Sequence, residues 1–259
     1  MDVKVVAFNI RYDSGRDGVN NWQYRKEPLQ RFLLEQNADI VCLQEVLHHQ
    51  YTYLIDHMES YGAVGNGRND GMTKGEYTPI FYKISKYDLV DNGMFWLSEN
   101  PYQMGSIGWD AKQPRIATWA KLKEKESGMT FLVINTHFDD IGRNARQKSA
   151  DLIWEFISQS DAPAILTGDL NDNPQSGLYE KLSNNADGLK DTHVIAKSQR
   201  GVNYTFHSFG KIPKERRTKI DYIFYKGPFE LKSEEIPEES NEGGAFLSDH
   251  NPIIVVMLL

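Results

Sequence analysis

Hydrophobic and polar residues follow two different periods along the first sixty residues. Residues 3–10 are β-branched and apolar, which predicts a buried strand. Residues 24–37 and 46–58 carry apolar side chains at helical spacing, and residues 39–44 between them form a second strand-like run. This order of strand, helix, strand and helix indicates an α/β layered domain.

The same order returns in the second half of the chain. Residues 129–136 form an apolar strand, residues 144–159 an amphipathic helix, and residues 162–167 another strand. Further strands are expected at residues 79–82, 87–97, 115–125, 204–209, 220–225, 231–237 and 253–259. There is no sequence repeat, but the two halves resemble similar layered units. No linker rich in Pro, Gly or Ser divides them, so we expect one domain over residues 1–259.

Polar side chains end or interrupt several of these apolar runs, where carboxylates and amides are otherwise out of place. The polar turns are Asn9, Gln44-Glu45, Asn135-Thr136-His137, Gly168-Asp169-Leu170-Asn171, Asp221 and Ser248-Asp249-His250-Asn251-Pro252. The last turn would hold a carboxylate and an imidazole against one reacting atom. We therefore expect the other turns to gather around Asp249 and His250.

Composition and charge narrow the class of protein. The 259 residues are 40% hydrophobic and 25% charged, with a net charge of −7, which argues against strong non-specific binding to nucleic acid. The single cysteine, Cys42, lies in an apolar run and is expected in the core, so no disulfide framework is possible. No apolar run approaches the roughly 18 residues of a membrane helix. The start at Met1 lacks the order of a signal peptide, which predicts a cytoplasmic protein if this start is the native one.

The chemistry of the polar turns favours a hard cation. Carboxylates, amides and histidines without a cysteine cluster suit Mg²⁺ or Mn²⁺ rather than structural zinc. Mg²⁺ is usually held by one or two carboxylates together with water and a substrate phosphate. The turns therefore predict a Mg²⁺ site, with Mn²⁺ as the alternative ion.

The turns also resemble, in the same order, the motifs of the metal-dependent endonuclease/exonuclease/phosphatase superfamily. The matching motifs are Phe8-Asn9, Leu43-Gln44-Glu45, Asn135-Thr136-His137, Gly168-Asp169-Leu170-Asn171, Ile220-Asp221-Tyr222-Ile223 and Ser248-Asp249-His250-Asn251-Pro252. Each is weak alone, but six in order cover the whole chain. The resemblance implies a four-layer α/β sandwich, in which helices flank two packed, mainly antiparallel β-sheets, with two pseudo-symmetric halves.

The resemblance implies a role for each turn. Glu45 would be the main metal ligand, with Asn9 beside it and Asp249 in the same shell or acting through water. Such a metal would polarise a phosphoryl oxygen and stabilise charge on the leaving group.

Five further residues would carry the chemistry. Asp169 would orient or deprotonate the attacking water, and Asn171 would hold that water or a phosphate oxygen. His250 would contact the phosphate or act as general base, with its imidazole aligned by Asp221. His137 would donate to a non-bridging phosphate oxygen. Members of the superfamily differ over whether Asp169 or His250 is the base, and the sequence leaves both open.

Three residues are candidates for substrate binding. Arg115 begins a strand and could clamp phosphate, with a surface ion pair as the alternative. Arg11 stands where several DNA-acting members carry an acidic residue, which makes a second metal site doubtful and directs Arg11 toward substrate. Trp109 lies in an irregular loop, and the sequence leaves open whether it lines the site. Aromatic residues in strand-like runs, Trp96, Trp119 and Phe206, are assigned to the core.

The resemblance implies a Mg²⁺-dependent phosphoester hydrolase in which water attacks phosphorus in line. The net negative charge favours a phosphodiesterase or phosphatase on a small or lipid-headgroup phosphate over an endo- or exonuclease acting on DNA or RNA. A non-catalytic phosphate-binding module is the remote alternative, because all six turns keep their polar residues. We expect a monomer with no membrane span whose partner is the phosphoester substrate, nucleic acid being possible but less favoured.

Overall fold

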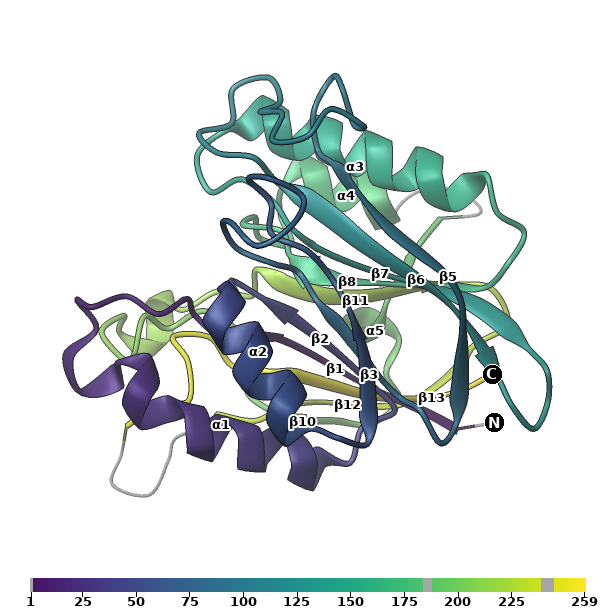
Figure 1. Ribbon diagram of the computed structural model, residues 1–259, viewed down its shortest axis with the longest axis horizontal. Coiled ribbons are helices and arrows are strands. Elements are labelled where there is room, and N and C mark those ends of the chain that lie inside the picture. Colours follow the sequence, from purple (N-terminus) through teal and green to yellow (C-terminus); the bar gives the residue numbers. More distant parts are fainter. Residues whose placement is uncertain (1, 184–187, 239–244) are drawn as a thin grey trace.

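The computed structural model describes residues 2–183, 188–238 and 245–259, and in these ranges two β-sheets pack face to face (Figure 1). Within the described ranges the first sheet has seven strands, in the order β10 (Gln199–Gly201), β12 (Glu230–Ile236), β13 (Ile253–Leu258), β1 (Asp2–Asn9), β2 (Ile40–Gln44), β4 (Ile80–Lys83) and β3 (Tyr61–Val64). The second has six, in the order β5 (Tyr87–Trp96), β6 (Ile116–Glu124), β7 (Thr130–His137), β8 (Ala164–Asp169), β11 (Asp221–Lys226) and β9 (Lys190–Asp191). Most neighbouring strands are antiparallel, but β1–β2, β7–β8 and β10–β12 are parallel, so both sheets are mixed.

Helices cover the outer faces of both sheets, which confirms the predicted four-layer sandwich. In Figure 1, α1 (Trp22–Gln36) and α2 (His48–His57) lie outside the first sheet, and α3 (Arg143–Ser158) and α4 (Gly177–Ser183) lie outside the second. The shorter helices are α5 (Thr192–Ile195), η1 (Gly18–Asn20) and η2 (Lys214–Arg216).

Strand β1 is buried on both faces, as its apolar sequence predicts. Val5 and Ala7 belong to the core between the two sheets, whereas Val6 and Phe8 belong to the core beneath α1 and α2. Cys42 lies in the core between the sheets, where burial raises the pKa of its thiol to about 12. Its predicted place in the core is confirmed.

The two halves share one strand topology. The order β13-β1-β2-β4-β3 in the first sheet matches β6-β7-β8-β11-β9 in the second, and each pair of neighbours has the same sense. In each half the two parallel strands end in polar residues that face each other: Asn9 pairs with Gln44, and His137 pairs with Asp169. The carboxyl ends of both parallel pairs therefore supply the candidate site.

A buried pair of amides joins the two sheets at these strand ends. Gln44 Nε2 donates to Asn135 Oδ1 at 2.6 Å, and Asn135 Nδ2 donates to the carbonyl oxygens of Leu43 and Pro79. Polar groups buried in a core stabilise only when they are paired, and a paired network fixes one geometry. Gln44 and Asn135 thus hold the ends of β2 and β7 at a fixed spacing.

The predicted strand at residues 204–209 is wrong. Apart from isolated bridges at Phe206, this segment is a loop whose backbone bonds the turn before β13. The Asn251 N–H donates to the Thr205 carbonyl oxygen, and the N–H groups of His207 and Ser208 donate to the Asp249 carbonyl oxygen. Aromatic content alone predicted a strand here, but the segment instead supports the turn that carries Asp249 and His250.

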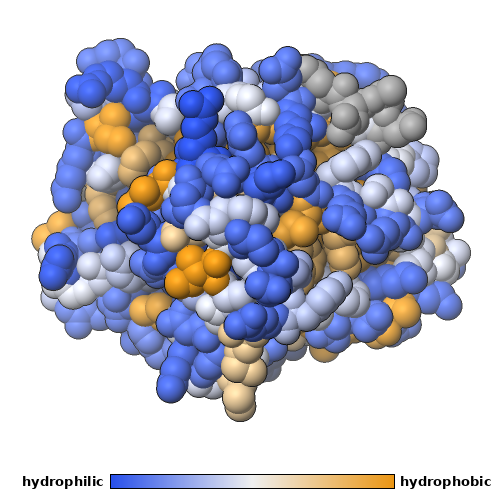
Figure 2. Space-filling model, turned by 90° about the horizontal axis from the view of Figure 1, so that it is seen from above, coloured by the Kyte–Doolittle hydropathy of each residue, from blue (hydrophilic) through white to orange (hydrophobic). Residues whose placement is uncertain are grey.

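The outer surface is largely polar on the face seen in Figure 2, where hydrophobic residues form small separate groups. That face shows no broad apolar patch of the kind that marks a permanent protein interface. Among the described residues, no helix combines the length and the apolar character needed to cross a bilayer.

Candidate active site

The polar turns meet around one cavity of about 580 Å³. Eight of the residues predicted for the site line it: Arg11, Glu45, Arg115, His137, Asp169, Asn171, Asp249 and His250. Asn9 and Asp221 are 0% and 2% exposed and touch this group from beneath. The structure therefore brings together ten of the eleven predicted residues.

Unusual backbone conformations place several of these side chains. Glu45 and Asn171 have φ values of 60° and 49°, in the left-handed region that costs energy for residues with a Cβ. Gly168 has φ 156°, and a Cβ there would lie 2.3 Å from the carbonyl oxygen of Thr136, so only glycine fits. Strain of this kind is common where side chains must be aimed at a functional site.

Glu45 and Asp249 form the first acidic grouping of the cavity. The guanidinium of Arg11 lies near both, with Nη1 3.7 Å from Glu45 Oε2 and Nε 3.8 Å from Asp249 Oδ2. Both carboxylates therefore lie around one cationic group at the same end of the cavity. Two carboxylates beside an open cavity match the donor set that Mg²⁺ uses, so the residues fit the predicted ion.

Asn9 links this grouping to the second one. Its Nδ2 donates to Glu45 Oε1 at 3.1 Å and to Asp169 Oδ2 at 3.0 Å, while its Oδ1 accepts the Arg11 N–H at 3.0 Å. The predicted metal ligand Asn9 therefore shares its Nδ2 between two carboxylates, and its oxygen accepts from the backbone of Arg11. This geometry makes Asn9 a residue that positions both carboxylates.

Asp169, Asp221 and His250 form the second grouping, with their ligand atoms within 4.8 Å of one another. His250 Nδ1 lies 2.8 Å from Asp221 Oδ2, and His250 Nε2 lies 3.8 Å from Asp169 Oδ2. These three groups could also hold a metal, but His250 Nδ1 is already committed to Asp221. The grouping has the layout of an imidazole aligned by one carboxylate and presented to another.

The pKa values of this grouping are displaced in useful directions. Burial alone would lower the pKa of His250, but the carboxylates of Asp221, Asp169 and Asp249 outweigh it and raise the pKa to about 10. Burial and the neighbouring Asp221 raise the pKa of Asp169 to about 7, against the charge of His250 and hydrogen bonds from Asn171 and Asn9. Near neutral pH, His250 is therefore an imidazolium and Asp169 can change its protonation state.

His137 is held as a neutral imidazole. Burial, and then the charges of Arg115 and Arg68, keep the pKa of His137 well below its usual value. Asn171 Nδ2 donates one hydrogen to the Phe138 carbonyl oxygen at 3.0 Å and lies 3.0 Å from His137 Nε2. Nε2 is therefore the acceptor, and the proton sits on Nδ1, which has no acceptor among the described residues.

Arg115 lines the cavity and is buried, and its ion pairs are made there and not at the surface. Its Nη2 lies 2.9 Å from Asp140 Oδ1, its Nε lies 3.4 Å from Asp139 Oδ2, and its Nη1 has no acceptor among the described residues. The two aspartates therefore orient the guanidinium through Nη2 and Nε, but not through Nη1.

Several cavity residues were not predicted. Arg68 and Glu76 line the wall beside Arg115 and are joined by an ion pair of 2.8 Å, and Gln113 also hydrogen-bonds Arg68. Burial raises the pKa of Glu76, although Arg68 opposes the rise. Their only sequence signal was a charged residue inside a glycine-rich loop, which is more often a solvated turn.

One aromatic prediction is wrong, and another gains no support. Phe206, which we assigned to the core, lines the cavity with its ring centroid 4.9 Å from that of His250. The reason is that residues 204–209 form a loop, so their side chains do not follow strand alternation. Trp109 is not among the described residues that line the cavity, and its backbone N–H donates to the Glu99 carboxylate.

Arg25 supports the site from behind, although its place in a helix gave no hint of this. It is 0% exposed, and its guanidinium donates to carbonyl oxygens of Ile10, Arg11 and Leu247. Burial lowers the pKa of Arg25 to about 10, so it stays charged at neutral pH. Arg25 thereby fastens the turn after Asn9 to the segment before Asp249.

Arg25→Met is expected to lower the free energy of unfolding by about 3 kcal/mol, because several buried carbonyl oxygens lose their donor at once. Urea unfolding followed by circular dichroism measures the change. Arg31→Met, at an exposed position of the same helix, is the matched control. Equal stability of the two variants would show that Arg25 holds nothing in place.

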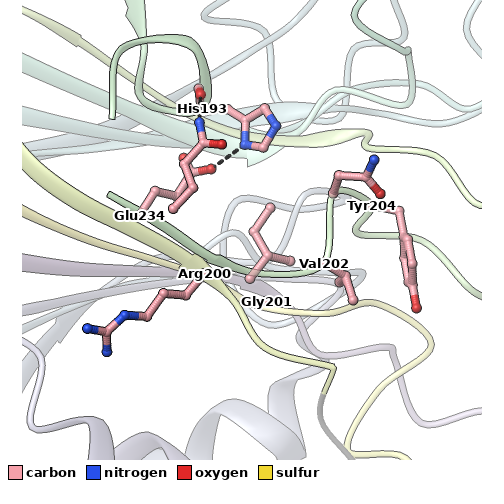
Figure 3. Close-up of a pocket in the computed structure, with 9 residues that line it drawn as sticks. His193, Arg200, Gly201, Val202, Tyr204 and Glu234 are labelled. Carbon is pink, nitrogen blue, oxygen red and sulfur yellow. Dashed lines mark hydrogen bonds and ion pairs between the residues drawn. The ribbon is translucent and has the colours of Figure 1, made fainter. Parts of the chain in front are cut away.

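A second cavity of about 390 Å³ lies beside β10 and β12 (Figure 3). Figure 3 shows His193 joined to Glu234, with Arg200 directed away from them, and the Nδ1–Oε1 distance is 2.5 Å. None of the predicted site residues is among the described residues that line it. His193 thus provides an imidazole paired with a carboxylate outside the candidate site.

Comparison with solved structures agrees with this architecture. An endonuclease/exonuclease/phosphatase from Bacteroides vulgatus is 46% identical, with a TM-score of 0.96 and coverage of 100% of this chain and 99% of that one. A mannosyl-6-phosphatase of Bacteroides thetaiotaomicron is 32% identical, with a TM-score of 0.93 and coverage of 99% of this chain and 100% of that one.

Among curated sequences, the Ccr4 exoribonuclease subunit of the CCR4-Not complex from Mycosarcoma maydis is 26% identical over 79% of this chain. The match spans only 40% of that longer protein. A sequence model of the Endonuclease/Exonuclease/phosphatase family matches residues 6–250, from the strand that carries Asn9 to His250. The chain therefore belongs to the Endonuclease/Exonuclease/phosphatase family, whose members are hydrolases acting on phosphoester bonds.

Proposed function

We propose that this protein is a Mg²⁺-dependent phosphatase that acts on a small phosphomonoester, with a sugar phosphate as the favoured substrate class. The observation that supports it most is that two groupings of ionisable side chains line one cavity. The first is the carboxylate pair of Glu45 and Asp249, and the second is the Asp169 carboxylate with the His250 imidazole. The similarity to a mannosyl-6-phosphatase over nearly the whole chain favours a monoester over a diester.

Glu45 and Asp249 are the residues proposed to hold the cation, for which Mn²⁺ is an alternative. A divalent cation bound there would supply Lewis-acid charge to a phosphoryl oxygen and to the leaving group. Asn9 keeps the Glu45 carboxylate in place through its Nδ2 and joins it to Asp169.

Asp169 is proposed as the general base. A water oxygen forms a bond to phosphorus and its proton passes to the Asp169 carboxylate. The bond from phosphorus to the alcohol oxygen breaks, the electron pair leaves with that oxygen, and the oxygen takes up a proton from solvent. The pKa of Asp169 near 7 suits a base that works at neutral pH, whereas the pKa of His250 near 10 makes that imidazole a poor acceptor. His250 instead donates to a phosphate oxygen, with Asp221 keeping it charged and aligned.

The opposite wall is proposed to bind the phosphate. Three donor atoms there lack acceptors among the described residues, namely Arg68 Nε, Arg115 Nη1 and His137 Nδ1. Because these three atoms are buried, the substrate is proposed to contact the exposed parts of Arg68 and Arg115, whose charges attract a phosphate. A monoester dianion offers more charge and more free oxygens to such a wall than a diester does.

A nuclease is the second candidate function, and the similarity to the Ccr4 exoribonuclease subunit supports it. The net charge of −7 weighs against it, because nucleic-acid binding rests largely on Lys and Arg contacts to phosphates.

A panel of substrates with Mg²⁺ distinguishes the two functions. We expect kcat/KM for phosphate release from a hexose 6-phosphate to exceed that for bis(p-nitrophenyl) phosphate and for shortening of an adenylate oligonucleotide. Faster shortening of the oligonucleotide at the same enzyme concentration would replace the phosphatase by a nuclease.

A further inference from the structure

Arg11 lies at the end of the cavity where the cation is proposed to bind. Its guanidinium approaches Glu45 Oε2 at 3.7 Å and Asp249 Oδ2 at 3.8 Å. Both distances are longer than a hydrogen bond between these atoms. Arg11 therefore offsets the negative charge of the two carboxylates while leaving their oxygens free to bind something else.

The hydrogen bonds of this guanidinium go to a third carboxylate, that of Asp17. Arg11 Nε lies 3.2 Å from Asp17 Oδ2, and Arg11 Nη2 lies 3.4 Å from Asp17 Oδ1. The Tyr12 ring contributes a cation–π contact at 4.3 Å. Asp17 thus anchors the guanidinium through Nε and Nη2, and its oxygens lie closer to the guanidinium than those of Glu45 and Asp249 do.

The backbone of Arg11 is also fixed in a costly conformation. Its φ is 59°, and its carbonyl oxygen accepts hydrogen bonds from Arg25 and Gln50. Such a conformation persists only where the surroundings impose it. The fold therefore fixes the backbone from which the Arg11 side chain reaches Asp17.

We propose that Arg11 is a tethered counter-ion that sets the affinity of the cation site, an inference that rests on the metal role proposed for Glu45 and Asp249. A guanidinium within 4 Å of both carboxylates stabilises them when no cation is bound and repels a divalent ion that enters beside it. Asp17 holds the guanidinium back from the two carboxylates, so that the ion can enter.

The two partners of this pair are expected to act in opposite directions. In Arg11→Gln a positive charge beside the site is lost, so Mn²⁺ is expected to bind about tenfold more tightly. In Asp17→Asn the guanidinium is released toward Glu45 and Asp249, so Mn²⁺ is expected to bind more weakly. Binding is measured on chelator-treated protein by electron paramagnetic resonance with Mn²⁺ and by calorimetry with Mg²⁺.

The double variant, Arg11→Gln with Asp17→Asn, distinguishes an effect that Asp17 exerts through Arg11 from the direct effect of losing the Asp17 charge. If Asp17 acts through Arg11, Asp17→Asn has little effect in the Arg11→Gln background. An Asp17→Asn effect of equal size in both backgrounds would overturn the tether.

Glu45→Ala separates this inference from the proposed function on which it rests. If Glu45→Ala binds Mn²⁺ as tightly as the wild type, the metal site itself is misplaced. If Glu45→Ala loses Mn²⁺ but Arg11→Gln binds it with unchanged or weaker affinity, only the role of Arg11 is overturned. Should Arg11→Gln fail to fold, as judged by circular dichroism, an unchanged Mn²⁺ affinity in Asp17→Asn has the same consequence.

Discussion

Glu45→Ala is expected to lower kcat for phosphate release by about a thousandfold. A Lewis-acid cation stabilises charge in the transition state by several kcal/mol, and about 4 kcal/mol corresponds to a factor of a thousand. Glu45 lines the cavity and accepts a hydrogen bond from the Asn9 amide, and it is the main ligand proposed for the cation, so its loss removes that ligand. Steady-state kinetics at saturating substrate and Mg²⁺ measure the change.

Glu126→Ala provides the control for Glu45, because that carboxylate is exposed in the turn after β6. It should retain the wild-type kcat. Far-ultraviolet circular dichroism should show that Glu45→Ala is folded. A folded Glu45→Ala enzyme with near-normal kcat would remove Glu45 from the site.

His250→Ala is expected to lower kcat by about a thousandfold as well, at the upper end of the range for loss of one hydrogen-bond donor to a charged transition state. Because the pKa of His250 is raised to about 10, the wild-type rate should fall as pH rises through that value and the imidazolium is lost. The variant should lose this alkaline fall. On the acidic side the rate should fall as pH drops through about 7, because Asp169 must be ionised to accept a proton.

His193→Ala is the matched control for His250, since both imidazoles bond a buried carboxylate through Nδ1. His193 belongs to the second cavity, so its loss should leave kcat and the pH profile unchanged. If His193→Ala and His250→Ala have equal effects, the loss reflects stability and not chemistry. A pH profile of His250→Ala that matches the wild type would show that the ionisation of His250 does not control the rate.

The layered fold was predictable because most of its strands are apolar runs, and because helices with clear periodicity separate β1 from β2 and β7 from β8. The polar ends of β1, β2, β7 and β8 also stood out, because a carboxylate or an amide at the end of an apolar run has few structural reasons to be there. The parallel pairing of Asn9 with Gln44 and of His137 with Asp169 explains why residues so distant in sequence meet.

The rest of the site depends on tertiary contacts that leave no local pattern. Arg25 looks like an ordinary polar residue of a helix, and only its bonds to four carbonyl oxygens from three separate segments make it structural. Arg68 and Glu76 lie in or beside a glycine-rich loop whose path is set by packing and not by periodicity. Phe206 reaches the cavity because its segment bonds the His250 turn instead of forming a strand.

Phosphate release from a hexose 6-phosphate, measured on chelator-treated protein as Mg²⁺ is added back, tests the central claim most directly. If the cavity is the active site of a metal-dependent phosphatase, the rate should be near zero with chelator and rise to saturation with Mg²⁺. The same titration of Glu45→Ala should stay flat. Full activity of the wild-type protein in excess chelator would contradict the account.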